Sequence, residues 1–135
     1  MYSVKSHLIA GPKPDWVSDE VHRAAQAYVP RMQEIYSDPD KSREWYLTVP
    51  PEVYDETMRI LNFNDPFYLI DQLVEPEDEG GLGLKRELKI IDVGCGTGLI
   101  GRHLSKAGFK DIFGTDGSTN VLERARSSGN YVETR

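Results

Sequence analysis

Residues 88–116 constrain the fold more than any other part of this chain of 135 residues. An apolar run ends at Val93 and passes directly into three glycines at alternate positions, Gly94, Gly96 and Gly98. A segment with helical spacing follows, and a second short apolar run then ends in an acid, Asp116. This order predicts a strand, a tight turn, a helix and a second strand parallel to the first.

The C-terminal part as a whole alternates between strand and helix patterns, which we expect over residues 88–93, 98–107, 111–115 and 118–128. Gly108 and Gly129 stand where helices commonly end in a left-handed residue, and Ser118 is placed to cap the last helix. Two parallel strands do not form a stable sheet alone, so the N-terminal helices or further strands must cover them.

The N-terminal part is predicted to be helical. Residues 1–17 are interrupted by prolines and are expected to form a loose arm. A helix begins after Ser18, a capping residue, and Pro30 kinks or ends it. Two more helices open at Pro51 and Pro66, because proline is tolerated in a first helical turn.

An acidic linker separates the two parts. Residues 75–83, EPEDEGGLG, carry four acids and three glycines, which favours a solvated segment. We therefore expect an N-terminal arm and helical cap over residues 1–80 and a partial α/β domain over residues 81–135.

The composition of the chain limits which classes of binding partner and which cellular compartment are expected. Twenty-two acids against sixteen bases give a net charge of −6, which argues against nucleic acid as a partner. Cys95 is the single cysteine, so an internal disulfide is excluded and a reducing compartment is expected. Neither a membrane-spanning run nor a signal peptide is present in the sequence, and we expect a cytoplasmic protein without a membrane partner.

A different physical reason explains why a glycine stands at each of the three positions of the turn. Gly94 lets the chain turn out of the strand, Gly96 lets the backbone approach a ligand closely, and Gly98 lets the helix start tight against the strand. Asp116 follows the next strand, where a carboxylate can accept hydrogen bonds from both hydroxyls of a ribose. The ligand is therefore expected to carry a free ribose.

Nine consecutive residues, IIDVGCGTG at 90–98, resemble the first motif of the class I S-adenosylmethionine-dependent methyltransferases, and the likeness continues through GTDGS at 114–118. It covers about residues 88–128 and implies the first βαβα half of a Rossmann-like methyltransferase domain, apparently truncated because strands three to seven are missing. It also implies that S-adenosylmethionine is bound by the glycine loop and two acids, namely Asp92, Gly94, Cys95, Gly96, Thr97, Gly98, Asp116 and Gly117.

Within the resemblance, the acid at Asp92 orients the loop and the methionine end of the cofactor, and the acid at Asp116 holds the ribose. The implied enzyme transfers a methyl group to an acceptor that we expect to be a small molecule, while a protein acceptor stays open. No catalytic base and no metal ligand is assigned. Whether this chain alone catalyses the methyl transfer is left open.

Two alternatives remain. Residues 96–101 also match the G-x-G-x-x-G pattern of NAD-binding folds, although the strand should then run directly into its first glycine, and here Gly94 takes that place. The chain could also be a truncated, non-catalytic isoform that binds a partner. In that case the edge of strand 88–93 and an apolar face would be exposed, with low stability or self-association as the result.

Other conspicuous side chains have simpler explanations. Cys95 is predicted to fill space rather than act as a nucleophile, and Asp92 could be only a structural acid. His103 is expected to face solvent, and His7 and His22 suggest no metal site. Core packing is the favoured role of most of the N-terminal aromatic residues, Tyr28, Tyr36, Trp45, Tyr46 and Tyr54.

Overall fold

The computed structural model describes residues 11–135. Most of the predicted arm over residues 1–17 therefore lies outside the described residues, and so does His7. The chain forms two compact units: a helical unit, Leu8–Phe63, and an α/β unit that contains Asn64–Arg135. The units therefore divide between residues 63 and 64, whereas the acidic linker predicts a domain boundary after residue 80.

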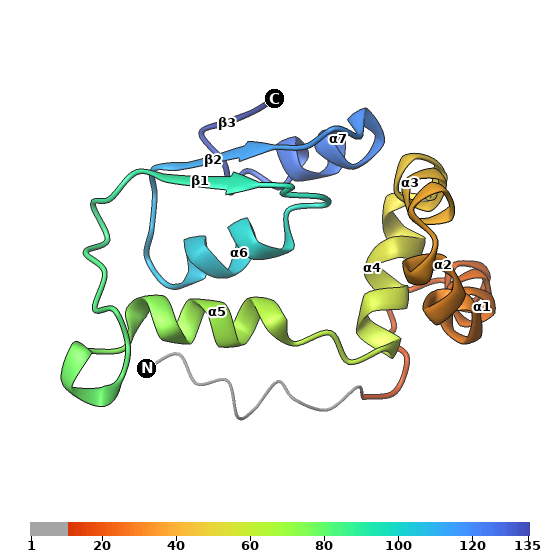
Figure 1. Ribbon diagram of the computed structural model, residues 1–135, viewed down its shortest axis with the longest axis horizontal. Helices are drawn as coiled ribbons and strands as arrows, with labels where there is room; N and C mark the ends of the chain where they lie inside the picture. The colour runs from red at the N-terminus through yellow and green to blue at the C-terminus, as the bar shows by residue number, and fades with distance from the viewer. Residues whose placement is uncertain (1–10) are drawn as a thin grey trace. The chain divides into compact units, whose positions relative to one another are not determined.

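The helical unit contains four α-helices and one short 3₁₀ helix among its described residues (Figure 1): α1 Asp19–Tyr28, η2 Val29–Arg31, α2 Met32–Ser37, α3 Pro39–Thr48 and α4 Pro51–Ile60. The predicted start after Ser18 is confirmed, since its Oγ accepts a hydrogen bond from the Val21 N–H at 3.2 Å. Pro30 ends α1 through the 3₁₀ turn, as expected.

Helix α3 was not predicted, because Asp38 and Pro39 suggest a turn. In the structure Asp38 caps α3 through its Oδ1, which accepts hydrogen bonds from the N–H groups of Asp40 and Lys41 at 3.0 and 3.2 Å. Pro39 occupies the first helical position, where no N–H is needed. The same residues that suggest a turn thus begin a helix.

An aromatic cluster fills the helical unit. Trp45 is only 4% exposed, and it contacts four tyrosine rings at centroid distances between 5.2 and 6.2 Å: Tyr28, Tyr36, Tyr46 and Tyr54. Core packing is therefore confirmed for Trp45. Tyr36 and Tyr46 lie at the edge of the cluster and are 49% and 39% exposed.

A buried ion cluster joins α1 to α4. Glu56 of α4 is 2% exposed, and its Oε1 lies 2.6 Å from Nδ1 of His22 on α1. Its Oε2 accepts a hydrogen bond from Nε of Arg59 at 2.6 Å. These contacts satisfy the buried carboxylate, and the hydrogen bonds from Arg59 are the largest cause that lowers the pKa of Glu56.

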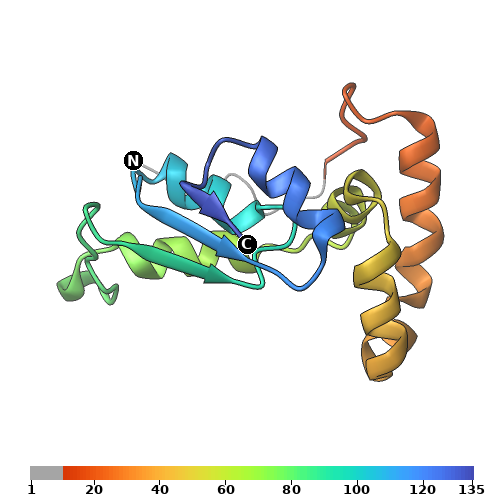
Figure 2. The ribbon, with the colours of Figure 1, turned by 90° about the horizontal axis from the view of Figure 1, so that it is seen from above.

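The α/β unit begins with a helix and then alternates strand and helix: α5 Asp65–Val74, η3 Glu77–Glu79, β1 Ile90–Val93, α6 Leu99–Lys106, β2 Ile112–Thr115, α7 Thr119–Ser127 and β3 Glu133–Thr134. All of these except η3 and β3 were predicted. The three strands are parallel and lie in the order β1-β2-β3 (Figure 2). The expectation of only two strands is thus wrong, because residues after Gly129 return to the free edge of β2.

Helix α5 belongs to the α/β unit because it packs on α6. Ile70 of α5 and Leu104 of α6 are fully buried in one cluster with Phe109 and Ile112. Figure 1 shows α6 between the strands and α5. This packing places the division of the chain before α5 rather than at the acidic linker.

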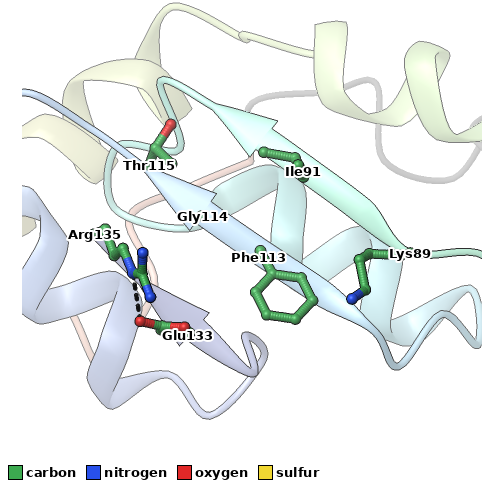
Figure 3. A pocket seen from close by; sticks show the side chains of 7 residues that line it. All are labelled: Lys89, Ile91, Phe113, Gly114, Thr115, Glu133 and Arg135. Atoms are coloured by element: carbon green, nitrogen blue, oxygen red, sulfur yellow. Dashed lines mark hydrogen bonds and ion pairs between the residues drawn. The ribbon is translucent and has the colours of Figure 1, made fainter.

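The two faces of the sheet differ. Ile112 and Asp92 lie on the face that packs on the helices and are 0% and 7% exposed, whereas Ile91 and Val93 on the opposite face are 63% and 80% exposed. On this open face a hollow of about 300 Å³ is lined by Lys89, Ile91, Phe113, Gly114, Thr115, Glu133 and Arg135 (Figure 3). The expected apolar surface beside this strand is present, while self-association stays a prediction.

Among residues 11–135, no helix combines the length and the apolar character that crossing a bilayer requires.

Candidate cofactor site

The glycine loop and the acid after β2 meet at one end of the sheet. Val93, the last residue of β1, pairs with Thr115, the last residue of β2, so the two carboxyl ends lie together. The carbonyl of Thr115 accepts hydrogen bonds from the N–H groups of Gly94 and Cys95 at 2.7 and 2.9 Å. The Gly96 N–H donates to Oδ2 of Asp116 at 2.9 Å. Ligands of open parallel sheets bind outside this end.

Asp116 holds the backbone around the candidate site in place and also has acceptor positions left for a ligand. Its Oδ1 accepts a hydrogen bond from the Ser118 N–H at 2.8 Å, at the start of α7. A carboxylate offers about four acceptor positions, and Gly96 and Ser118 use two of them. Two therefore remain for the hydroxyls of a ribose, so the residue fits the predicted ligand. The sequence did not predict that Asp116 also accepts hydrogen bonds from the backbone of the glycine loop and of the start of α7.

The loop glycines adopt backbone conformations that other residues avoid. Gly94 and Gly96 have φ of 75° and 54°, and a Cβ on either would meet no atom within 4 Å. Open space therefore borders the part of the loop where a ligand is expected. Gly98 differs, since its Cβ would lie 3.1 Å from the Tyr131 ring and 3.2 Å from Cα of Ala125. Its close contact is with Tyr131 and α7, not with the strand.

Asp92 lies beneath the loop and is held by a residue that the sequence did not suggest. The hydroxyl of Tyr131 donates to Oδ2 of Asp92 at 2.7 Å and accepts from the Gly101 N–H at 3.1 Å. Burial raises the pKa of Asp92, the hydrogen bond from Tyr131 opposes the rise, and the charge of Asp116 adds to it. The only sequence signal for Tyr131 is an aromatic residue in an otherwise polar C-terminal segment.

The remaining predicted site residues divide between the inside and the outside of the loop. Cys95 is 5% exposed and packs on Leu122, Ala125 and Tyr131, and burial raises the pKa of its thiol to about 11. It is therefore a neutral, space-filling thiol, as predicted. Thr97 is also buried, at 4% exposed, whereas Gly117 is exposed.

The expectation that His103 faces solvent is wrong. The side chain is 5% exposed, and its ring lies 4.1 Å from the ring of Phe67 on α5. The reason is that α5 covers this face of α6. Among residues 11–135, no three His, Cys, Asp or Glu side chains gather as a metal site would require.

A parallel sheet with a glycine loop after its first strand and an acid after its second is the arrangement with which Rossmann-like α/β folds bind nucleoside cofactors. Residues 90–134 match the family model of a methyltransferase domain. The chain is also similar to the human methyltransferase-like protein 27, with 35% identity over 78 residues. No solved structure matches the chain.

These comparisons confirm the resemblance to the class I methyltransferases over the C-terminal part of the chain. The similar stretch covers 58% of this chain and 30% of the human relative, so the chain spans less than a third of that protein. The strand ends at Val93, and Gly94 follows it directly, which is the spacing of the methyltransferase motif rather than of the NAD pattern.

Proposed function

We propose that this chain is the cofactor-binding part of an S-adenosylmethionine-dependent methyltransferase that acts on a small-molecule acceptor. The observation that carries the proposal is the 2.9 Å hydrogen bond between the Gly96 N–H and Asp116. It brings a loop in which glycines alternate with two buried side chains, and a carboxylate with free acceptor positions, to the same edge of the sheet.

Each residue at this edge of the sheet binds a different part of the cofactor. Asp116 accepts hydrogen bonds from the two ribose hydroxyls, the backbone of Gly94 and Gly96 borders the cofactor, and Asp92 acts at its methionine end. When bound, the cofactor supplies a methyl group on a sulfonium, which leaves readily. The protein therefore contributes alignment of donor and acceptor and exclusion of water. No residue is proposed as a base.

The charge of the chain narrows the class of acceptor, and a protein acceptor stays open. A net charge of −6 disfavours a nucleic acid, which attracts basic surfaces. We place the protein in the cytoplasm, since its one cysteine is a buried free thiol.

Calorimetric titration of the chain with S-adenosylhomocysteine and, separately, with NAD tests the cofactor. We expect the thioether to bind and NAD not to bind. Asp116→Ala should weaken binding about 100-fold or more, because two hydrogen bonds to a charged group are lost. Asp116→Asn, which keeps the size and one oxygen, should weaken it about tenfold.

Asp78→Ala is the matched control, because it removes an exposed acid of the same unit far along the sequence from the loop. It should bind like the unaltered chain. Since Asp116 also caps the loop and α7, each variant needs a thermal melt to show that it is folded. Binding of NAD without binding of the thioether would contradict the proposal.

A second candidate, a non-catalytic chain that binds a partner, is favoured by the open face of the sheet, where Ile91 and Val93 are 63% and 80% exposed. Sedimentation at several concentrations tests it. A mass that rises with concentration supports this candidate, and a monomer with a sharp, concentration-independent melt contradicts it.

A further inference from the structure

We propose that Tyr131 is a positioning residue of the cofactor site, which holds the Asp92 carboxylate ready to pair with the amino group of the cofactor's methionine part. The inference rests on the proposed function and adds a residue that lies outside the glycine motif. Tyr131 is not expected to touch the cofactor and acts through Asp92.

The hydroxyl of Tyr131 bridges the two elements that flank the loop. It donates to Oδ2 of Asp92 on β1 at 2.7 Å and accepts from the N–H of Gly101 on α6 at 3.1 Å. One side chain therefore links β1, which precedes the loop over residues 94–98, to α6, which follows it. Tyr131 uses one of the roughly four acceptor positions of the Asp92 carboxylate, so others remain for a ligand.

The ring of Tyr131 lies in a slot that three glycines leave open. A Cβ at Gly101 would lie 2.2 Å from Cζ of the ring, one at Gly114 would lie 2.9 Å from Cε1, and one at Gly98 would lie 3.1 Å from Cε2. Glycine inside a helix costs stability, about 1 kcal/mol relative to alanine, so Gly101 in α6 is retained at a cost. The slot fixes the ring, and the ring fixes the hydroxyl.

The hydroxyl matters because Asp92 must stay charged to pair with an ammonium group. The titratable groups that act on Asp92 are Tyr131 and Asp116 at the end of β2, while the charge of Asp92 in turn acts on the thiol of Cys95. Burial and the charge of Asp116 raise the pKa of Asp92, and only Tyr131 lowers it. From α6, the group that reaches the Tyr131 hydroxyl is the uncharged N–H of Gly101. The hydrogen bond from Tyr131 therefore favours the anionic form of this buried carboxylate.

Tyr131→Phe tests this, because it keeps the ring in its slot and removes only the hydroxyl. At neutral pH, S-adenosylhomocysteine should bind about tenfold more weakly. Binding should also be lost at a higher pH on acidification, since the pKa of Asp92 rises. Tyr68→Phe, on an exposed tyrosine of α5, is the matched control and should change neither. In an Asp92→Asn background, Tyr131→Phe should not shift the pH profile.

A second readout needs no ligand. The Asp92 carboxyl, labelled with carbon-13 and titrated by NMR in the free chain, should show a higher pKa in Tyr131→Phe than in the unaltered protein. An unchanged Asp92 pKa together with an unchanged binding profile would overturn the role of Tyr131. Failure of the unaltered chain to bind the thioether would instead overturn the proposed function, whatever the NMR titration shows.

Discussion

The helical unit and the α/β unit differ in how completely they bury their apolar and charged side chains. In the helical unit the largest buried side chain, Trp45, is surrounded by tyrosine rings, and the buried carboxylate of Glu56 has two basic partners. In the α/β unit one face of the sheet is packed on helices, while Ile91 and Val93 of the other face are 63% and 80% exposed.

The difference follows from the elements themselves. A helix has one apolar stripe, and a few short helices can bury their stripes against one another. A parallel sheet has two faces, and both are usually covered. In the described residues, helices pack on only one face of β1 and β2. The core of the α/β unit is therefore one-sided, although Gly96 and Asp116 still meet at the carboxyl ends of its strands.

The same substitution on the two faces of the sheet gives the largest expected contrast. Ile112→Thr places a hydroxyl among Ile70, Leu104 and Phe109 and should lower the free energy of unfolding by about 2–4 kcal/mol. Ile91→Thr, on the open face, should change it by less than about 0.5 kcal/mol. Hydrogen exchange of the β1 and β2 amides measures both. Equal losses would mean that the open face is covered in solution.

The ion cluster of the helical unit predicts a smaller effect that depends on pH. Arg59 and His22 lower the pKa of Glu56, so the folded state binds a proton more weakly than the unfolded state does. The resulting stability is present above the ordinary glutamate pKa of 4.5 and is lost as the pH falls through the lowered folded value. Glu56→Gln should cost about 2 kcal/mol at neutral pH, because Arg59 and His22 lose their charged partner while staying partly solvated.

Hydrogen exchange of α1 and α4 from neutral to acid pH measures the loss. In Glu56→Gln the decline of stability below the glutamate pKa should flatten. Glu34→Gln is the comparison, because Glu34 pairs with Lys41 at the exposed surface of the same unit. Solvent screens this pair, so the substitution should flatten the decline much less than Glu56→Gln does. A similar decline in Glu56→Gln would show that other carboxylates dominate the acid sensitivity of this unit.

The sequence predicts the elements of the site well because their causes are local. The run from β1 through Gly98 into α6 has a pattern that only a strand, a glycine turn and a helix satisfy. The meeting of Asp116 with this loop also follows, since the carboxyl ends of neighbouring parallel strands adjoin.

What escapes prediction depends on contacts between residues that are distant in sequence. Strand β3 has two residues, Glu133–Thr134, and forms because β2 offers a free edge. Tyr131 reaches Asp92 across 39 positions of the chain. His103 is buried because α5 covers α6, which no feature of α6 alone reveals. Such outcomes are set by packing, and the local pattern carries no trace of them.

Two serines at helix starts give the smallest predicted contrast and show where local prediction stops. Ser18 caps α1 through its Oγ, which bonds the Val21 N–H. Ser118 has the same position before α7 and was predicted to cap it, but its side chain makes no capping hydrogen bond, and its Oγ is buried without a partner. Asp116 bonds the Ser118 N–H instead.

Ser18→Ala should therefore cost about 1 kcal/mol, as loss of a helix cap usually does. Ser118→Ala should be neutral within about 0.5 kcal/mol or slightly stabilising, because it removes a buried hydroxyl that has no hydrogen bond and leaves the contact of Asp116 with the backbone intact. Hydrogen exchange in the first turns of α1 and α7 compares the two. A loss at Ser118 as large as at Ser18 would show that the hydroxyl turns to cap α7 in solution.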